Sequence, residues 1–412
     1  MPFMETKTNA PRPSHRSLAG LDWFIFFLAD VQTGFGPFVA VYLTAAQWTQ
    51  QDIGFILSVT GLVSLIGRMP GGALVDAARS ERNAAAIAVV CIGLSALIFA
   101  ALPAFAPVLF ASVLSSSANC VLAPAIGAIS LGLVGHAMIG PRLGRNARFA
   151  SLGTGFAAAG MGITGYFFSS RSVFVVTALL LVPTLIALSQ IRATEVDPVR
   201  AHSGVASPDR PDYGLLRLAL NPPLLAFAAC NALFQLANAA MLPLMGSIMT
   251  MRSANWATVL IAACIIVPQL VVAALSPWIG RQADRWGRRP LLLLGFGALP
   301  LRCLLFAYTP EPAFVVFFQI LDGISAAALG VLVPLVIADI ARDTGRFNLA
   351  QGAVGTAVGV GASVSTSFAG YVSDHYGSQT AFLDLAAVAT FGFLFVLVAM
   401  PETRPREIRA RR

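Results

Sequence analysis

Long apolar runs, separated by short clusters of charged, Pro, Gly and Asn residues, make up most of this chain. Runs such as 84–101 are apolar on every face of a helix and lack the alternating pattern of a membrane β-barrel strand. Because about 20 apolar residues cross a bilayer as a helix, the pattern predicts an all-α membrane protein. Twelve spanning helices are predicted, at 19–45, 52–75, 83–103, 106–134, 146–169, 172–191, 220–248, 255–279, 290–309, 312–340, 347–373 and 379–400.

The composition predicts that lipid is the main solvent of the folded chain. Of 412 residues, 57% are hydrophobic and only 11% are charged, which leaves too few polar side chains to cover a water-exposed surface. The net charge of +8 comes from arginines scattered between apolar runs, so nucleic acid is not expected as a partner. The five cysteines lie in apolar segments without metal-ligand spacing, and neither a metal site nor a disulfide is expected.

Basic residues orient the predicted helices. With a cytoplasmic amino terminus, 24 of the 27 Lys and Arg residues lie on the cytoplasmic side, Arg171 and Arg252 lie outside, and Arg302 lies within a helix. The positive-inside rule then places both termini in the cytoplasm and requires an even number of spans. The first apolar run is long enough to span, which predicts a membrane anchor rather than a cleaved signal peptide.

A polar segment divides the chain into two halves. The stretch 192–219 is rich in Pro, Ser and charged residues, and it predicts a cytoplasmic linker. It joins a six-helix bundle at 19–191 to a second at 220–400, and short tails at 1–18 and 401–412 flank them. Neither tail is long enough for a soluble domain, which disfavours a membrane sensor or assembly partner as the function.

Similar segments recur in the two halves. A loop with Gly, Asp and Arg is expected after the second helix of each half, at 71–82 and at 280–289, and Gly72 and Gly280 in these loops are 208 residues apart. A Gly-Arg-Asn-like segment precedes each fifth helix, from Gly144 and from Gly345, 201 residues later. Bundles built from such repeats, with a site at the middle of the membrane, are typical of secondary transporters.

The stretch 280–289, GRQADRWGRR, resembles the G-x-L-a-D-r-x-G-r-k signature of the major facilitator superfamily. The copy at 72–82 keeps the glycine, the leucine and the aspartate but lacks the second glycine. The resemblance covers about 19–400 and implies that superfamily's fold of two pseudo-symmetric six-helix bundles. It also implies a transporter in the lipid bilayer. Neither an enzyme activity nor a cofactor is expected, because the four histidines are scattered at loops and ends and no G-x-x-x-x-G-K-[ST] loop occurs. A monomer is expected.

In the superfamily this loop is thought to hold the two halves together on the cytoplasmic side. We therefore expect Asp284 to meet the start of the fifth helix near Arg145 and Asn146. Asp76 is expected at the start of the eleventh helix near Arg346 and Asn348, since a carboxylate is attracted to the positive amino end of a helix. The alternative is that these charges only set topology. The predicted gate residues are Asp76, Arg145, Gly280, Asp284, Arg285, Gly287, Arg288 and Arg346.

Polar residues inside the spans suggest a substrate path, because an ionised side chain at mid-bilayer costs at least about 2.5 kcal/mol. Asp30, in the first span, has no basic residue at its depth in its own half and is the leading candidate for proton coupling. Asp322 is the second candidate, or else it forms a structural ion pair with Arg302. Helices 1, 4, 7 and 10 line the cavity in the superfamily, and here they carry Gln32, Asn119, Asn231, Gln235, Asn238 and Gln319 as expected substrate-cavity residues.

Some of these amides have a second interpretation, since Asn and Gln often join membrane helices to one another. The favoured function is secondary active transport of a small organic solute, with proton-coupled export (antiport) ahead of proton-coupled uptake of a nutrient. An acidic cavity without a central Lys or Arg favours an amphipathic or cationic solute. Helix 4 lacks the arginine of the superfamily's drug/proton antiporters, and helix 5 lacks their proline, which disfavours a drug pump. Composition suggests a bacterial inner membrane.

Overall fold

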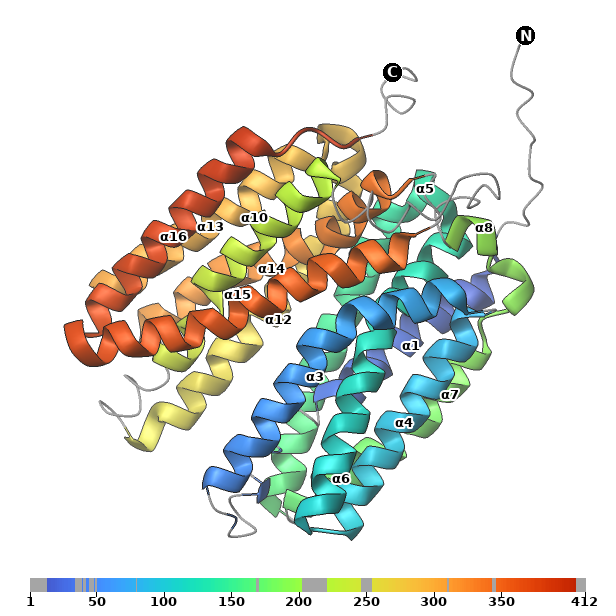
Figure 1. Ribbon diagram of the computed structural model, residues 1–412, viewed down its shortest axis with the longest axis horizontal. Helices are drawn as coiled ribbons and strands as arrows, with labels where there is room; N and C mark the ends of the chain where they lie inside the picture. Colours follow the sequence, from blue (N-terminus) through green and yellow to red (C-terminus); the bar gives the residue numbers. More distant parts are fainter. Residues whose placement is uncertain are drawn as a thin grey trace.

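The computed structural model describes residues 13–33, 50–78, 80–167, 170–201, 221–245, 254–309, 311–342 and 346–404, with Val39, Tyr42, Leu43 and Trp48. Within these residues the chain is helical and has no strand, which confirms the predicted all-α class. The helices form two groups that lie side by side (Figure 1). The first contains α1 (His15–Thr33), α3 (Gln50–Ala77), α4 (Glu81–Ala101), α5 (Phe105–Phe167), α6 (Ser170–Leu179), α7 (Leu181–Ser189), η1 (Ala193–Glu195) and α8 (Pro198–Ala201). The second contains α10 (Pro222–Asn238), α12 (Ala254–Trp286), α13 (Arg288–Tyr308), α14 (Pro312–Ile340), α15 (Phe347–Tyr376) and α16 (Ser378–Ala399).

Nine helices among the described residues are long and apolar enough to cross a membrane. One of them, Phe105–Met161, has 57 residues, far more than the roughly 20 that a single crossing needs. Its backbone breaks at Gly135, where φ is 66°, a conformation that glycine adopts without steric cost. The break divides α5 into helices at 105–134 and 136–167. The protein is therefore a multi-pass membrane protein, and the count of twelve spans and the side of the termini remain predictions.

Three predicted boundaries are wrong. The fifth span, predicted at 146–169, begins at 136, and the segment between is helical although it carries Arg142 and Arg145. Both arginines form ion pairs with Asp22 of α1. A search for apolar runs does not detect such pairs, so it began the span too late. The expected loops at 71–82 and 280–289 are also mostly helical, because α3 runs to Ala77 and α12 to Trp286.

The linker is described only in its first part. Residues 192–201 pack on the first half, where the backbone N–H of Asp197 donates to the carbonyl of Gly132 over 3.2 Å. Val196 lies against the same glycine. The rest of the predicted linker, 202–219, lies outside the described residues.

Candidate functional site

Most described arginines outside the apolar runs lie at one end of the bundle, which we call the basic end. It contains the start of α1 and the ends of α3, α12 and α16 (Figure 1). The turn at Gly135 lies beside Arg200 of α8. Among the helix pairs through which the two halves meet at the basic end, the most extensive contacts are those of α3 with α15 and of α12 with α5. Both pairs approach so closely that a glycine of one helix lies against the backbone of the other.

At the α3–α15 interface, a methyl group on Gly72 would collide with the carbonyl of Asn348. One on Gly352 would collide with the carbonyl of Arg68. Asp76 lies at the start of α15 and accepts the backbone N–H of Leu349 at 2.8 Å, the backbone N–H of Asn348 at 3.3 Å and the side-chain amide of Asn348 at 2.7 Å. The expected contact between Asp76 and Asn348 is therefore present, and it caps the helix as a carboxylate does at a positive helix end.

Arg346 lies at the position expected for it, as the residue immediately before α15. Its role in the gate stays a prediction.

The α12–α5 interface has the same backbone geometry. Gly280 lies against the carbonyl of Gly140, and Gly144 against the carbonyl of Ser276. Each member of these pairs is 208 residues from its counterpart in the other interface, because Gly140 corresponds to Asn348 and Gly144 to Gly352. The predicted spacing of 201 residues at the fifth and eleventh helices is therefore wrong.

The predicted contact of Asp284 with Arg145 and Asn146 is also wrong. Asp284 lies beside Gly140 and accepts a hydrogen bond from the guanidinium of Arg288 at 3.1 Å. The cause is local, because α5 offers fewer donors at this point than α15. Gly140 has no side chain where Asn348 has an amide, and the next residue, Pro141, has no N–H.

Arg145 instead belongs to a network inside the first half. Its guanidinium lies 2.6 Å from Asp22, which is buried and also contacts Arg142 at 2.5 Å. Arg142 donates to Asn146, whose amide in turn donates to Ser130 at 2.8 Å. The buried charges are thus compensated, as a membrane interior requires. Asp22 was not predicted as a site residue, because its basic partners lie 120 and 123 residues away in the chain.

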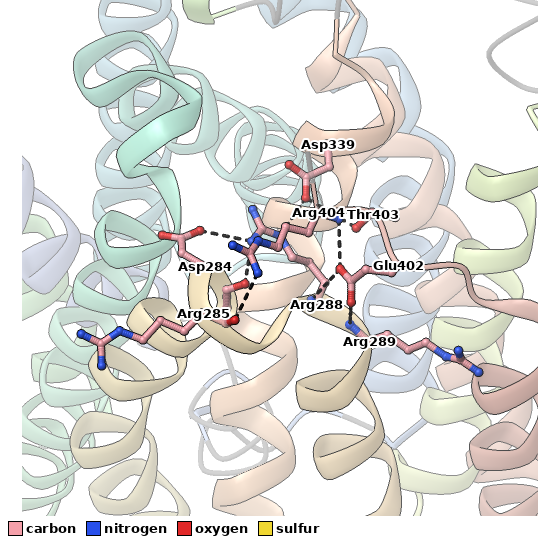
Figure 2. Close-up of polar contacts among 9 residues, drawn as sticks. Asp284, Arg285, Arg288, Arg289, Asp339, Glu402, Thr403 and Arg404 are labelled. Atoms are coloured by element: carbon pink, nitrogen blue, oxygen red, sulfur yellow. Dashed lines mark hydrogen bonds and ion pairs between the residues drawn. The ribbon is translucent and has the colours of Figure 1, made fainter. Parts of the chain in front are cut away.

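Arg288 is the centre of a polar cluster in the second half (Figure 2). Its side chain is buried and contacts the carboxylates of Asp339 at 2.9 Å and Asp284 at 3.1 Å. It also donates to the carbonyl of Ala283 at 2.6 Å. These partners lie on α12 and α14 of the same half, so Arg288 joins helices within the half rather than across the gate.

A residue of the carboxyl-terminal segment caps α13. Glu402 accepts the backbone N–H of Arg288 at 2.8 Å and that of Arg289 at 3.1 Å. The turn before α13 is made by Gly287, whose φ of 98° favours glycine. The Arg285 side chain is exposed, and its carbonyl accepts a hydrogen bond from Arg404 at 3.1 Å. Glu402 was not predicted as a site residue, because the segment after the last span was interpreted as a basic tail.

Away from the basic end, the paired helices separate. Gly61 on α3 is eleven residues, or about three turns, from Gly72, and Gly155 on α5 is eleven residues from Gly144. Each therefore lies on the same face as an interface glycine, yet neither has another heavy atom within 4 Å of its Cβ position. The described halves touch at the basic end and diverge beyond it (Figure 1).

Arg302 contacts several of the predicted cavity residues. Its guanidinium, 3% exposed, forms an ion pair with Asp322 and donates to Asn238 and, at 3.3 Å, to Gln319. Asp322 is 28% exposed, so the carboxylate faces outward and the arginine lies behind it. The ion pair that the sequence left open is present. Together, the contacts of Arg302 join α10, α13 and α14.

The remaining predicted residues divide between exposed and buried positions. Gln32 of α1 donates to Asn119 of α5 at 2.7 Å, and this amide pair is exposed. Asn231 is buried and donates to the carbonyl of Phe227 in its own helix at 2.8 Å, which fits a packing role. Gln235 is half-buried on α10. The side chain of Asp30 lies outside the described residues.

Comparisons with known proteins agree on one family. A profile described as "Major Facilitator Superfamily" matches residues 21–281 and 227–412. An "uncharacterized MFS-type transporter" of Mycobacterium tuberculosis is 38% identical over 403 residues, which cover 96% of each chain. "Multidrug resistance protein 2" of Bacillus subtilis is 27% identical over 169 residues, 41% of each chain. The solved structure of FucP, titled an MFS transporter in the outward conformation, has a TM-score of 0.71 at 15% identity and covers 94% of this chain and 98% of its own.

Proposed function

Because the chain belongs to the major facilitator superfamily and is one of its transporters, we propose that it moves a small organic solute by alternating access. The observation that carries this proposal is the arrangement of its halves, which touch at the basic end and diverge beyond it. Two rigid halves that rock around a central site expose that site to one side at a time. We further propose twelve spans with both termini in the cytoplasm, so that the described state is open to the outside.

The proposed substrate path has a polar group on each half. The exposed Gln32–Asn119 pair supplies amide donors and acceptors on the first half. Asp322 supplies a partly exposed carboxylate on the second. Arg302 balances the charge of Asp322, which corrects the premise of an acidic cavity without a central arginine. The preference for a cationic or amphipathic solute therefore rests on Asp30.

Proton coupling is proposed through Asp30, with Asp322 as the second candidate. The position of Asp30 in the first span and the charge balance at Asp322 support this order. Export is the favoured direction, and the partial similarity to a protein named for multidrug resistance supports it. A bacterial inner membrane is the proposed location, supported by the mycobacterial relative. The working unit is proposed to be a monomer.

The test places purified protein in liposomes with an internal pH dye, imposes a proton gradient and screens a chemically mixed solute panel. Wild type is compared with Asp30→Asn and Asp322→Asn. Asp374→Asn is the control, because Asp374 is exposed at the far end of α15. Solute-dependent proton flux that is lost only in Asp30→Asn, while solute exchange persists, is the expected result. Solute movement indifferent to the gradient and to Asp30 would remove the coupling mechanism.

A further inference from the structure

Arg68 crosses the boundary between the halves inside an apolar span. It lies on α3, within the candidate span Ser58–Ala77, eight residues or about 12 Å from Asp76. Its guanidinium donates a hydrogen bond to the carbonyl of Gly355 on α15. The side chain follows the surface of α15, because a Cβ at Gly355 would lie 3.3 Å from Arg68 Cδ and one at Gly359 3.8 Å from Cζ.

The cation has an unusual environment. Among the described residues, no carboxylate lies within ion-pair distance of Arg68, and its hydrogen-bond partner there is a backbone carbonyl. A cation in a span is costly, and the positive-inside rule is already satisfied by arginines at the helix ends. Its position therefore calls for a role beyond topology.

The other interface lacks this arrangement. The position equivalent to Arg68 is Ser276, whose hydroxyl is buried without a described hydrogen-bond partner. The positions equivalent to Gly355 and Gly359 are Ala147 and Ser151. The arginine and the glycines that make room for it occur together, and at one interface only.

We propose that Arg68 is a gating residue, whose hydrogen bond to Gly355 holds the basic end closed and must break each time that end opens. This inference rests on the proposed alternating access. Asp76 caps the rim of the same interface, and Arg68 adds a second attachment two turns deeper. Close packing needs no such bond, because the α12–α5 interface achieves the same helix approach without one.

The test measures the distance between spin labels at Asn83 and Trp286, which are exposed at the basic end in opposite halves, without substrate. Arg68→Met keeps the length of the side chain and removes the donors. It is expected to raise the ratio of open to closed basic ends about fivefold, the size expected for one hydrogen bond. Arg68→Lys retains a donor and is expected to shift the ratio less. Ser276→Ala is the matched control and is expected to leave it unchanged.

Gly355→Ala provides a second variant if Arg68→Met does not fold, because its methyl group crowds the arginine at 3.3 Å. It is expected to shift the ratio in the same direction. An unchanged ratio in the arginine variants, or an equal shift in Ser276→Ala, would overturn the proposal. Solute flux measured in parallel separates the two hypotheses. A distance shift without any transport by wild type would sink only the proposed function, and normal transport without a shift would sink only the role of Arg68.

Discussion

At the α3–α15 interface, Asp76 and Arg68 form hydrogen bonds from one half to the other. At the α12–α5 interface, the corresponding partners of α5 are a glycine and a proline, and Ser276 replaces the arginine. The backbone approach is nevertheless the same on both sides. Small residues thus fix how closely the halves pack, and the polar residues decide how firmly each side is held.

This difference has a mechanical consequence. Packing between small residues in a membrane is weakly directional and allows helices to slide, whereas a helix cap and a guanidinium bond require one register. The α3–α15 interface is therefore expected to carry most of the free energy that favours the closed basic end. The α12–α5 interface then serves mainly as a sliding contact.

The largest effect is expected from the close glycine contacts, which both interfaces have. Gly72→Ala and Gly280→Ala each place a methyl group against a backbone carbonyl of the other half, and overpacking of this kind costs about 1–3 kcal/mol. Both variants should open the basic end and slow transport by about tenfold, as measured by the Asn83–Trp286 distance and by flux in liposomes. Gly155→Ala, where space is open, is the control. An inert Gly280→Ala would mean that only one interface packs closely.

An intermediate effect is expected from Asp76 and Asp284, the equivalent aspartates whose contacts differ between the two interfaces. Asp76→Asn removes a carboxylate that caps α15, and the closed basic end should lose about 1–1.5 kcal/mol, a shift of about tenfold in the same distance measurement. Asp284→Asn removes a group that contacts Arg288 within its own half. It should lower thermal stability but shift the distance ratio by less than about twofold. Equal shifts in the two variants would contradict the comparison.

The sequence predicted the helical class and the Asp76 contact for identifiable reasons. Long apolar runs identify membrane helices. Asp76 lies in a segment that recurs in the second half. The contact of Asp284 failed because the repeat was aligned through Asn146 rather than through Gly140. The structure extends the 208-residue spacing of the loops to the fifth and eleventh helices, where Pro141, which has no N–H, corresponds to Leu349.

The sequence predicted which polar residues lie within the spans, but not which of them contact one another. Arg302 was considered as a partner of Asp322 alone, whereas it also binds Asn238 and Gln319. Arg68 was not predicted as a site residue, because a sequence does not show which helix of the other half faces it. Partners that are distant in the chain require the packed structure, and no spacing rule supplies them.

The smallest effect is expected from two acids that follow the last helix of each half. Glu402 caps α13, and Glu195 accepts the backbone N–H of Ser14 at 2.8 Å and its hydroxyl at 2.9 Å, at the start of α1. Burial by itself would raise the pKa of Glu195, but hydrogen bonds from Ser14 and Ser17 and the charge of Arg192 lower it below its ordinary value. The pairing therefore stabilises the first half above the ordinary glutamate pKa of about 4.3.

Since the pKa of Glu195 is lower in the folded state, its contribution to stability is complete above that ordinary value and is lost as pH falls through the folded pKa. Glu195→Gln should lower the thermal midpoint by about 1–3 °C, by an amount that stays constant between about pH 7 and 5 and shrinks below about pH 4. Glu402→Gln is the matched variant in the second half, and its lower midpoint should come with no change in the Asn83–Trp286 distance. If Glu195→Gln lowered the thermal midpoint by the same amount at about pH 3.5 as at about pH 7, the carboxylate charge would not be what holds the start of α1.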